Sequence, residues 1–258
     1  MVKIENDEYT IFNADAFEKI DEIKNSSYKY NHIITDPPYN ISKDNNFNTL
    51  NRPRTGVNFG PWDKDFDLFS WIAPYCSLLD KNGSIIIFCS YRFISFIISV
   101  LEEEADMEVK DVLEWKKTNP MPRNINRRYV QDTEFAIWAV KKNGKWIFNK
   151  PDDKKYLRST FETSIVSGKE KIGHPTQKSL KLMNDIISIH TNIGDTIIDP
   201  FMGSGTTGLA ALNLNRKFIG IEKEKVYFEM AKNRLADPLS DFINNDSNIN
   251  DEGIFYVN

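Results

Sequence analysis

The sequence has few cysteines and histidines and no long hydrophobic run. Its 258 residues include three histidines and two cysteines, Cys76 and Cys89, and neither cysteine has a Cys or His neighbour at the spacing of a metal site. We therefore expect reduced core cysteines in a cytoplasmic protein, and no metal. No stretch approaches 18 consecutive apolar residues, which argues against a membrane-spanning helix. The charged residues 1–9 lack the apolar region of a signal peptide.

The composition is that of one globular domain. A hydrophobic content of 40% in a chain of this length can form one sizeable core. Strand-like runs alternate with helix-like ones, which favours an α/β fold with a doubly wound, mostly parallel sheet and helices on both faces. Strands are predicted over 84–88, 108–115, 134–140, 196–198 and 217–221, and helices over 68–79, 91–104, 206–214 and from His174 onward. We expect a single domain over residues 1–236 and an acidic tail over 237–258.

The segment Asp36-Pro37-Pro38-Tyr39 follows a short apolar run that ends at Ile34. Its two prolines prevent a helix and remove two backbone donors, so the chain leaves the strand in a stiff, extended turn. The Asp36 carboxylate and the Pro37 carbonyl only accept hydrogen bonds, and the Tyr39 ring can stack on a planar base. This combination suits the exocyclic amine of a nucleobase, although the same residues could form a plain strand-ending turn.

A second segment, 199–207, reads Asp-Pro-Phe-Met-Gly-Ser-Gly-Thr-Thr. It follows the predicted strand 196–198 and opens the predicted helix 206–214, and an acid, Glu222, closes the next strand. Glycines in such a loop allow tight turns and close approach of the backbone to a ligand. If the strands that end at Asp36 and Asp199 are neighbours, both segments share one cleft beyond the carboxyl ends of the strands.

The two segments, in this order, resemble those of the DNA amino-methyltransferases that use S-adenosylmethionine. The order, with the catalytic motif before the cofactor loop, is that of the permuted β group, and the resemblance covers residues 10–235. It implies a seven-stranded methyltransferase sheet and S-adenosylmethionine as cofactor. It also implies DNA as substrate in a restriction–modification system, with a possible cognate restriction endonuclease as partner and a monomeric or homodimeric enzyme.

The resemblance also implies the site residues and the reaction, which is direct in-line methylation of adenine N6 on a base flipped out of the duplex. The catalytic residues would be Asp36, Pro37, Pro38 and Tyr39. The cofactor-binding residues would be Asp15, Ala16, Asp36, Thr176, Lys178, Asp199, Pro200, Phe201, Gly203, Ser204, Gly205, Thr206, Thr207 and Glu222. Thr176 and Lys178 would hold the cofactor carboxylate at a helix start, and Glu222 the ribose hydroxyls. Asp15 would approach the cofactor adenine, or simply cap a helix.

Positive charge is concentrated in one part of the chain. Residues 115–158 contain twelve Lys and Arg against four Asp and Glu, a net charge of +8 in a chain of net charge −4. A basic face on an acidic body is typical of phosphate binding, although such a stretch can be merely solvated. DNA contacts are expected from Lys116, Lys117, Arg123, Arg127, Arg128, Lys150 and Lys154. Residues 40–64 are predicted to form a flexible lid or DNA loop, and 141–172 a small basic target-recognition insert.

Several other functions fit the sequence less well. Methylation of cytosine N4 uses the same amine chemistry, but family members with that activity usually carry Ser where Asp36 stands. Methylation of RNA or a small molecule, or a catalytically idle binding module, remain as more distant alternatives. Cytosine C5 methylation is excluded because it needs a Cys after Pro, whereas Cys76 follows Tyr and Cys89 follows Phe. A P-loop nucleotidase is excluded because the glycine loop lacks the required Lys.

Overall fold

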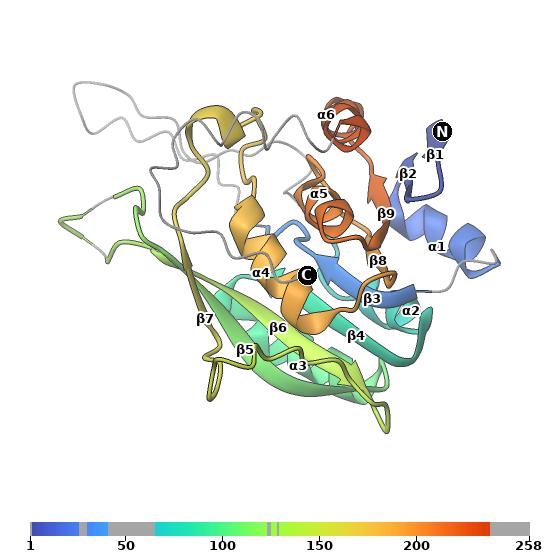
Figure 1. The fold of residues 1–258 in the computed structure, drawn as a ribbon, viewed down its shortest axis with the longest axis horizontal. Coiled ribbons are helices and arrows are strands. Elements are labelled where there is room, and N and C mark those ends of the chain that lie inside the picture. Colours follow the sequence, from blue (N-terminus) through green and yellow to red (C-terminus); the bar gives the residue numbers. More distant parts are fainter. Residues whose placement is uncertain (1, 26–29, 41–64, 123–124, 128, 238–258) are drawn as a thin grey trace.

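The computed structural model describes residues 2–25, 30–40, 65–122, 125–127 and 129–237, which form one open sheet with helices packed on it (Figure 1). Within these ranges, nine strands lie in the order β1-β2-β9-β8-β3-β4-β6-β5-β7. The strands are β1 (Val2–Glu5), β2 (Tyr9–Asn13), β3 (Tyr30–Thr35), β4 (Leu79–Cys89), β5 (Met107–Lys117), β6 (Thr133–Lys141), β7 (Thr160–Thr163), β8 (Thr196–Asp199) and β9 (Lys217–Glu222). The helices are α1 (Ala16–Lys24), α2 (Ile72–Cys76), α3 (Ile94–Glu103), α4 (Leu180–His190), α5 (Thr206–Asn213) and α6 (Lys225–Ala236), with 3₁₀ helices at Tyr91–Phe93 and Gly168–Glu170.

The sheet has two halves. Strands β2, β9, β8, β3 and β4 run parallel to one another and are called the parallel half below. β6 runs antiparallel to β4, and β5 runs antiparallel to β6; these two strands, together with β7, are called the antiparallel half. The predicted mostly parallel α/β fold is confirmed. Because parallel strands end at the same edge, the loops after β3, β8 and β9 lie together.

The sheet has two strands more than the seven that the resemblance implied, and they are the edge strands β1 and β7. β1 forms a hairpin with β2. In the hairpin turn, Asn6 Oδ1 accepts hydrogen bonds from the N–H groups of Glu8 (2.9 Å) and Tyr9 (2.7 Å). β7 lies in the segment 141–172, where only an irregular insert was predicted, and pairs in parallel with β5. Each has four residues, and so short a run shows no clear periodicity.

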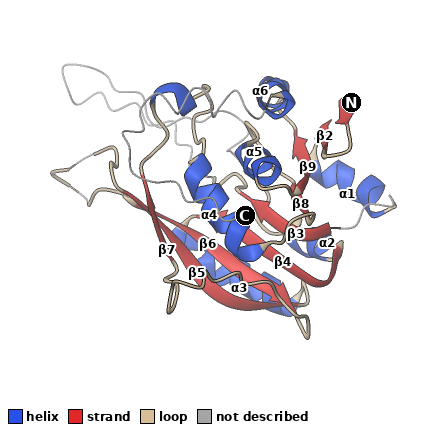
Figure 2. Cartoon of the chain, in the orientation of Figure 1, coloured by secondary structure: helices blue, strands red, loops and turns tan. Residues whose placement is uncertain are grey.

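Helices cover both faces of the sheet (Figure 2). One face packs against α4, α5 and α6, and the other packs against α1, α2 and α3. Successive strand residues point to opposite faces, so Ile34 and Ile86 belong to the first core and Ile33 and Ile85 to the second. All four are buried, which explains why these central strands are continuous apolar runs.

Two predicted helices have different limits in the structure. The helix predicted over 68–79 is only α2, and the turn expected after it lies inside β4, where the pairing with β3 shifts register. α4 begins at Leu180 rather than at His174, so Pro175 does not occupy its first turn. The N-cap is Ser179, whose Oγ accepts a hydrogen bond from the N–H of Leu182. A Ser directly before an apolar run is the stronger start signal.

Other predictions have mixed outcomes. The strands and helix predicted over 196–221 correspond to β8, α5 and β9. Both cysteines are buried and free, as expected. Residues 41–64 of the predicted lid and 238–258 of the predicted tail lie outside the described residues. Among the helices that are described, none is long and apolar enough to cross a membrane.

Candidate active site

The two sequence segments meet because their strands are neighbours. β3 pairs in parallel with β8 through His32↔Ile197 and Ile33↔Ile198. At the end of these strands, Thr35 Oγ1 donates a 2.6 Å hydrogen bond to Asp199 Oδ1. The prediction that the strands ending at Asp36 and Asp199 share one cleft is thus confirmed.

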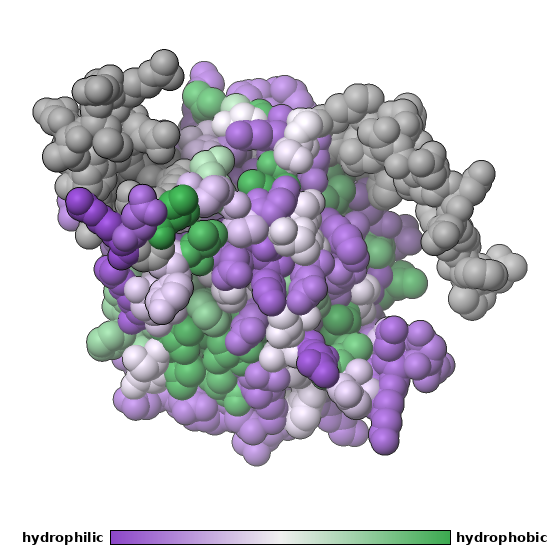
Figure 3. All heavy atoms as spheres, turned by 90° about the vertical axis from the view of Figure 1, so that its left-hand side faces the viewer, coloured by the Kyte–Doolittle hydropathy of each residue, from purple (hydrophilic) through white to green (hydrophobic). Residues whose placement is uncertain are grey.

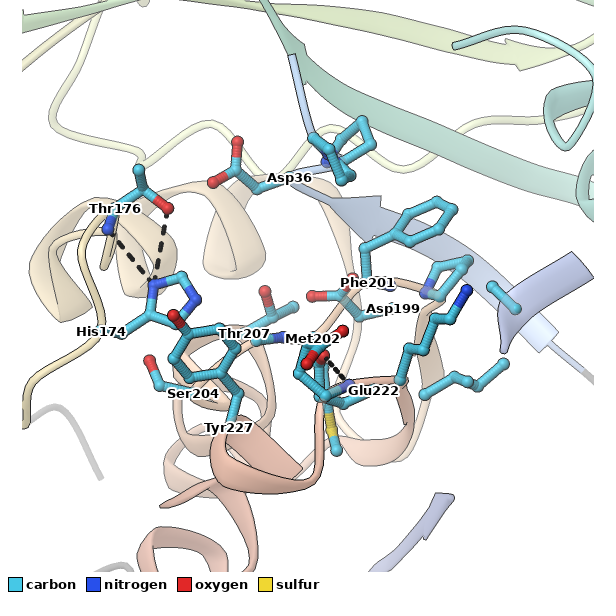
Figure 4. Close-up of a pocket in the computed structure, with 18 of the residues that line it drawn as sticks. Asp36, His174, Thr176, Asp199, Phe201, Met202, Ser204, Thr207, Glu222 and Tyr227 are labelled. Carbon is cyan, nitrogen blue, oxygen red and sulfur yellow. Dashed lines mark hydrogen bonds between the residues drawn. The ribbon is translucent and has the colours of Figure 1, made fainter. Parts of the chain in front are cut away.

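A cavity of about 680 Å³ lies at this edge of the sheet. It is lined by all four predicted catalytic residues and by every predicted cofactor-binding residue except Gly205. Sequence reasoning did not assign a site role to further lining residues, which include Phe17, Phe66, His174, Gln177, Met183, Lys223, Glu224 and Tyr227. In Figure 4, Asp36, Thr176 and His174 lie towards one end of the cavity, while Phe201 and Glu222 lie towards the other.

The two glycines of the loop 199–207 have different roles. Both have positive φ, 51° at Gly203 and 78° at Gly205, a conformation that glycine adopts at little cost. Gly203 lines the cavity, and a Cβ there would lie 3.1 Å from His174 Nε2. At Gly205 a Cβ would instead lie 3.0 Å from the Cβ of Ala231 in α6. Gly205 therefore permits close packing of α5 on α6, and its contact with the cofactor stays a prediction.

Two acids, the buried Asp199 and the half-buried Glu222, organise this loop. Glu222 Oε2 accepts the N–H of Gly203 (2.9 Å), and its Oε1 accepts the N–H of Glu224 (2.7 Å). Burial raises the pKa of Glu222 to about 7, against the opposing effect of these hydrogen bonds. Asp199 Oδ1 accepts the N–H of Phe201 (3.0 Å) as well as the Thr35 hydroxyl, and burial raises its pKa to about 6. Each Glu222 oxygen keeps a free lone pair for a further donor.

Asp15 is a helix cap and also lines the cavity. Its Oδ1 accepts the N–H of Phe17 (2.9 Å) at the start of α1, and its Oδ2 forms an ion pair with Lys223 (2.8 Å). The helix-cap interpretation is confirmed, whereas contact with the cofactor adenine stays a prediction.

Aromatic rings line the neighbouring part of the cavity. The ring of Phe66 packs edge to face against the rings of Phe201 and Phe17, with ring centroids 5.2 Å and 5.8 Å apart, respectively. Only Phe201 was expected, because Phe66 follows the patternless residues 41–64 and belongs to no motif. The rings make this end of the cavity apolar.

The Asp36 carboxylate lies in a cluster of charges. Its Oδ1 accepts the hydroxyl of Tyr39, and its Oδ2 accepts Lys178 Nζ. Lys178 Nζ also forms an ion pair with Glu134 Oε2 at 3.1 Å, and Lys117 Nζ donates to Glu134 Oε1. The prediction that Lys178 occupies a helix start is wrong, because α4 begins two residues later. Glu134 was missed; the available signal was a single acid opening an apolar strand within a basic stretch.

Burial and pairing shift the pKa values of this cluster in different directions. Burial raises the pKa of Asp36 despite the nearby Lys178. Burial also opposes the ionisation of Glu134, but the two lysines lower its pKa to about 2. For Lys178, burial disfavours the ammonium, yet the two carboxylates raise its pKa. At neutral pH Glu134 is therefore an anion and Lys178 a cation.

His174 and Tyr227 form the wall of the cavity beside the glycine loop. The centroids of their rings are 4.4 Å apart. His174 Nδ1 accepts a 3.3 Å hydrogen bond from the N–H of Thr176. Burial, together with Lys178, lowers the pKa of His174 to about 4, so the imidazole is neutral at pH 7. His174 lies in the segment before α4 and Tyr227 lies in the first turn of α6, and the sequence assigned a site role to neither.

Among the predicted DNA-binding residues that the structure describes, none lines the cavity, and they differ in what surrounds them. Lys116 and Arg127 are exposed. Lys117 is held by Glu134, so its ammonium belongs to the Asp36 cluster. Lys150 Nζ donates to the backbone carbonyl of Pro151 (3.1 Å), and Lys154 lies 3.9 Å from Asp153. Arg123 and Arg128 lie outside the described residues.

Comparison with known sequences supports the resemblance. The model of a family described as DNA methylase matches residues 30–233. The chain is 34% identical over 248 residues to the type II methyltransferase M2.LlaDCHI of Lactococcus lactis subsp. cremoris, covering 90% of each chain. It is 33% identical over 242 residues to the type II methyltransferase M2.DpnII of Streptococcus pneumoniae, covering 87% of this chain and 88% of that relative.

Solved structures agree with this family. The fold matches a crystal structure of an M1.HpyAVI–SAM complex with a TM-score of 0.74 and 55% identity, over 88% of this chain and 98% of that one. It also matches the cytosine-N4-specific PvuII DNA methyltransferase with a TM-score of 0.62 over 93% and 94% of the chains, where 16% identity shows a shared fold only. The chain therefore belongs to the DNA methylase family and is an S-adenosylmethionine-dependent DNA methyltransferase.

Proposed function

We propose that this enzyme methylates the exocyclic N6 of adenine at specific sites in DNA, on a base flipped out of the duplex. The observation that carries the proposal is the position of Asp36, an acid with a raised pKa that lines the same cavity as the glycine loop. A base in a duplex is too enclosed to reach such a carboxylate, so it must leave the stack.

The cavity suits S-adenosylmethionine. Its volume of about 680 Å³ lies in the range of small-molecule sites. The Phe201 ring offers an apolar surface for the adenine, and the free lone pairs of Glu222 can accept the two ribose hydroxyls. Thr176 and the N–H groups of the loop 199–207 would face the amino-acid end. When bound, the cofactor supplies an electrophilic methyl group.

The chain's own residues would prepare the target amine. Asp36 and the Pro37 carbonyl accept its two hydrogens, which draws the nitrogen toward sp³ geometry and localises its lone pair. Asp36, whose pKa burial raises, is placed to take the proton that the amine loses. Tyr39 would stack on the base, and its hydroxyl holds Asp36 Oδ1. Most of the rate would come from positioning the reacting groups.

The test is to identify the product. Duplex DNA is incubated with the enzyme and labelled S-adenosylmethionine, digested, and its nucleosides are separated. We expect labelled N6-methyladenine. Labelled N4-methylcytosine would favour the alternative target, and no labelled nucleoside would favour an idle binding module.

We further propose how the enzyme works with its partners. The exposed Lys116 and Arg127, together with Lys150 and Lys154, would contact DNA phosphates, with residues 141–172 as the recognition insert. Because its relatives are type II methyltransferases, the chain would act in the cytoplasm beside a cognate restriction endonuclease, as a monomer or homodimer. Sequencing methylated DNA from cells with and without the protein would reveal the recognition site.

A further inference from the structure

A row of alternating charges ends at the catalytic carboxylate. It runs from Lys117 at the end of β5, through Glu134 in β6 and Lys178 before α4, to Asp36 after β3. Four separate parts of the chain thus contribute one charge each. A row with one sign next to the other is the arrangement that lets partly buried charges stabilise each other.

Lys178, the third member of the row, was predicted to bind the cofactor carboxylate but has no part in the chemistry proposed above. Its side chain is 7% exposed, so its ammonium is almost removed from water and depends on its partners for stabilisation. Those partners are Asp36 Oδ2 and, at 3.1 Å, Glu134 Oε2. Glu134 is in turn held by Lys117 through its other oxygen. The ammonium is therefore fixed from two sides, with one side being the catalytic acid.

This arrangement decides which Asp36 atoms are fixed. Tyr39 donates to Oδ1 and Lys178 donates to Oδ2, so the carboxylate cannot rotate without breaking one of the two hydrogen bonds. A carboxylate oxygen has two lone pairs, so each oxygen can still accept a hydrogen of the amine. Burial favours the protonated form of Asp36, and the Lys178 cation counteracts this effect. A protonated Asp36 would have one acceptor position fewer for the amine.

We propose that Lys178 and Glu134 are positioning residues for methyl transfer: Glu134 holds the Lys178 ammonium against Asp36, and Lys178 keeps Asp36 ionised and correctly oriented. The inference rests on the proposed role of Asp36 as acceptor of the amino hydrogens. It gives Lys178 a role at the catalytic acid instead of at the cofactor carboxylate. It also assigns a role to Glu134, which belongs to none of the motifs.

Other titratable groups lie near this row of charges and affect the pKa values of its members. Those that influence Asp36, Lys178 or their direct partners are Tyr39, Cys89, Lys117, His174 and Asp199. His174 is neutral at pH 7, and burial raises the pKa of Cys89 to about 12. Around neutral pH, the charged side chains that shift the pKa of Asp36 are therefore Lys178, which lowers it, and Glu134, which raises it.

The experiment measures the acid limb of the pH–rate profile for single-turnover methyl transfer at saturating cofactor. Lys178→Met should move this limb to higher pH by about 1–3 units, because Asp36 loses an opposite charge. Glu134→Gln should move it the other way, since Glu134 raises the pKa of Asp36, and should lower the plateau rate because Lys178 is no longer held. The double variant should return the limb towards wild type, and Lys178→Arg should keep it there.

Carbon-13 NMR of the Asp36 carboxyl in the cofactor-free protein should show the same order among the variants: the pKa of Asp36 should be highest in Lys178→Met and lowest in Glu134→Gln. As a matched control, Lys181→Met removes an exposed lysine three positions along, paired only with Asp185 on its own helix, and should move neither readout. If Lys178→Met does not fold, Glu134→Gln and Lys178→Arg carry the test.

Two results would overturn the inference. One is an unmoved acid limb in both Lys178→Met and Glu134→Gln. The other is weakened cofactor binding in Lys178→Met with an unmoved limb, which would return Lys178 to the cofactor carboxylate. Asp36→Asn separates this failure from that of the proposed function. If Asp36→Asn is inactive, only the role of Lys178 and Glu134 is lost; if it is fully active, the role of Asp36 itself is wrong.

Discussion

The parallel and antiparallel halves of the sheet contribute to the same site in different ways. β3, β8 and β9 of the parallel half place Asp36, Asp199 and Glu222 together, because parallel strands end at one edge. In the antiparallel half, the end of β5 pairs with the start of β6, so Trp115 lies opposite Glu134 and Lys117 reaches it. The first half provides groups that face the cavity, and the second provides the Lys117–Glu134 pair, which holds Lys178, the counter-charge of Asp36.

The same comparison changes how the basic stretch is understood. All its positive charges looked equally available for DNA in the sequence. In the structure, Lys117 is 17% exposed and neutralises Glu134, whereas its neighbour Lys116 faces solvent. Alternate residues of a strand point to opposite sides, so two adjacent lysines serve two purposes. Net charge over a segment therefore overestimates the charge that meets phosphates.

Asp36→Asn should have the largest effect, because it removes the reacting acceptor of the parallel half. The rate of methyl transfer should fall by at least about two to three decades, the loss expected for one transition-state hydrogen bond. The loss should appear in kcat rather than KM, while calorimetry should show unchanged cofactor affinity. Tritium transfer to DNA measures the rate, and an equal loss in kcat and affinity would instead assign Asp36 to the cofactor.

Glu222→Gln should weaken cofactor binding by about 10- to 100-fold, the equivalent of a hydrogen bond to a charged group of about 1.5–3 kcal/mol. If the ribose hydroxyls donate to the carboxylate, as proposed, the affinity of the wild type for the cofactor should rise as pH increases through the folded-state pKa of about 7. The Gln variant should lack this rise. Isothermal titration between pH 5.5 and 8.5 tests both statements, with pH-independent wild-type affinity as the contrary outcome.

Stability should show the opposite pH dependence. The folded-state pKa of Glu222, about 7, lies above its ordinary value of 4.5 because of burial, so the folded protein favours the protonated form. The contribution of Glu222 is present below about pH 4.5 and is lost as pH rises through about 7. In the cofactor-free protein, the difference in unfolding free energy between Glu222→Gln and wild type should therefore grow in favour of the variant over this window.

The two glycines allow a matched comparison within the parallel half. Gly203→Ala and Gly205→Ala both force a side chain into positive φ, at a cost of about 1–2 kcal/mol. Gly205→Ala should lower the unfolding free energy further, because its Cβ meets α6, and should leave cofactor affinity nearly unchanged. Gly203→Ala should lower affinity, because its Cβ enters the wall of the cavity beside His174. Thermal melts and calorimetry separate the two, and equal effects would contradict the assignment.

The smallest effect should distinguish the two neighbouring lysines of β5. If Lys116 contacts a phosphate, Lys116→Ala should reduce the log–log salt slope of DNA binding by about 0.9. Lys117→Ala should leave that slope unchanged and instead lower the methylation rate, because Glu134 loses its partner. Binding measured by fluorescence anisotropy over a salt series decides this; equal slopes for both variants would place the docking face elsewhere.

Much of the fold and of the candidate site could be predicted from the sequence, because the sequence signals that mark them are local. Two prolines after an apolar run define the stiff turn at Asp36, and the apolar runs and turn residues identify β8, α5 and β9. Nearly all the predicted cofactor residues line the cavity, since the resemblance fixed which residues matter and parallel pairing of β3 with β8 brought them together.

Only the tertiary structure decided the partners of the charged groups. Lys178 and Asp36 are 142 residues apart, and Lys117 and Glu134 are 17 apart across a strand pair. No local pattern encodes such contacts, because they depend on which strands are neighbours and on which face each side chain lies. The same holds for Gly205. A side chain at this position would meet Ala231 of α6, which lies 26 residues further along the chain. Local backbone chemistry thus determined where the site is, and packing over long sequence distances determined which charges hold Asp36.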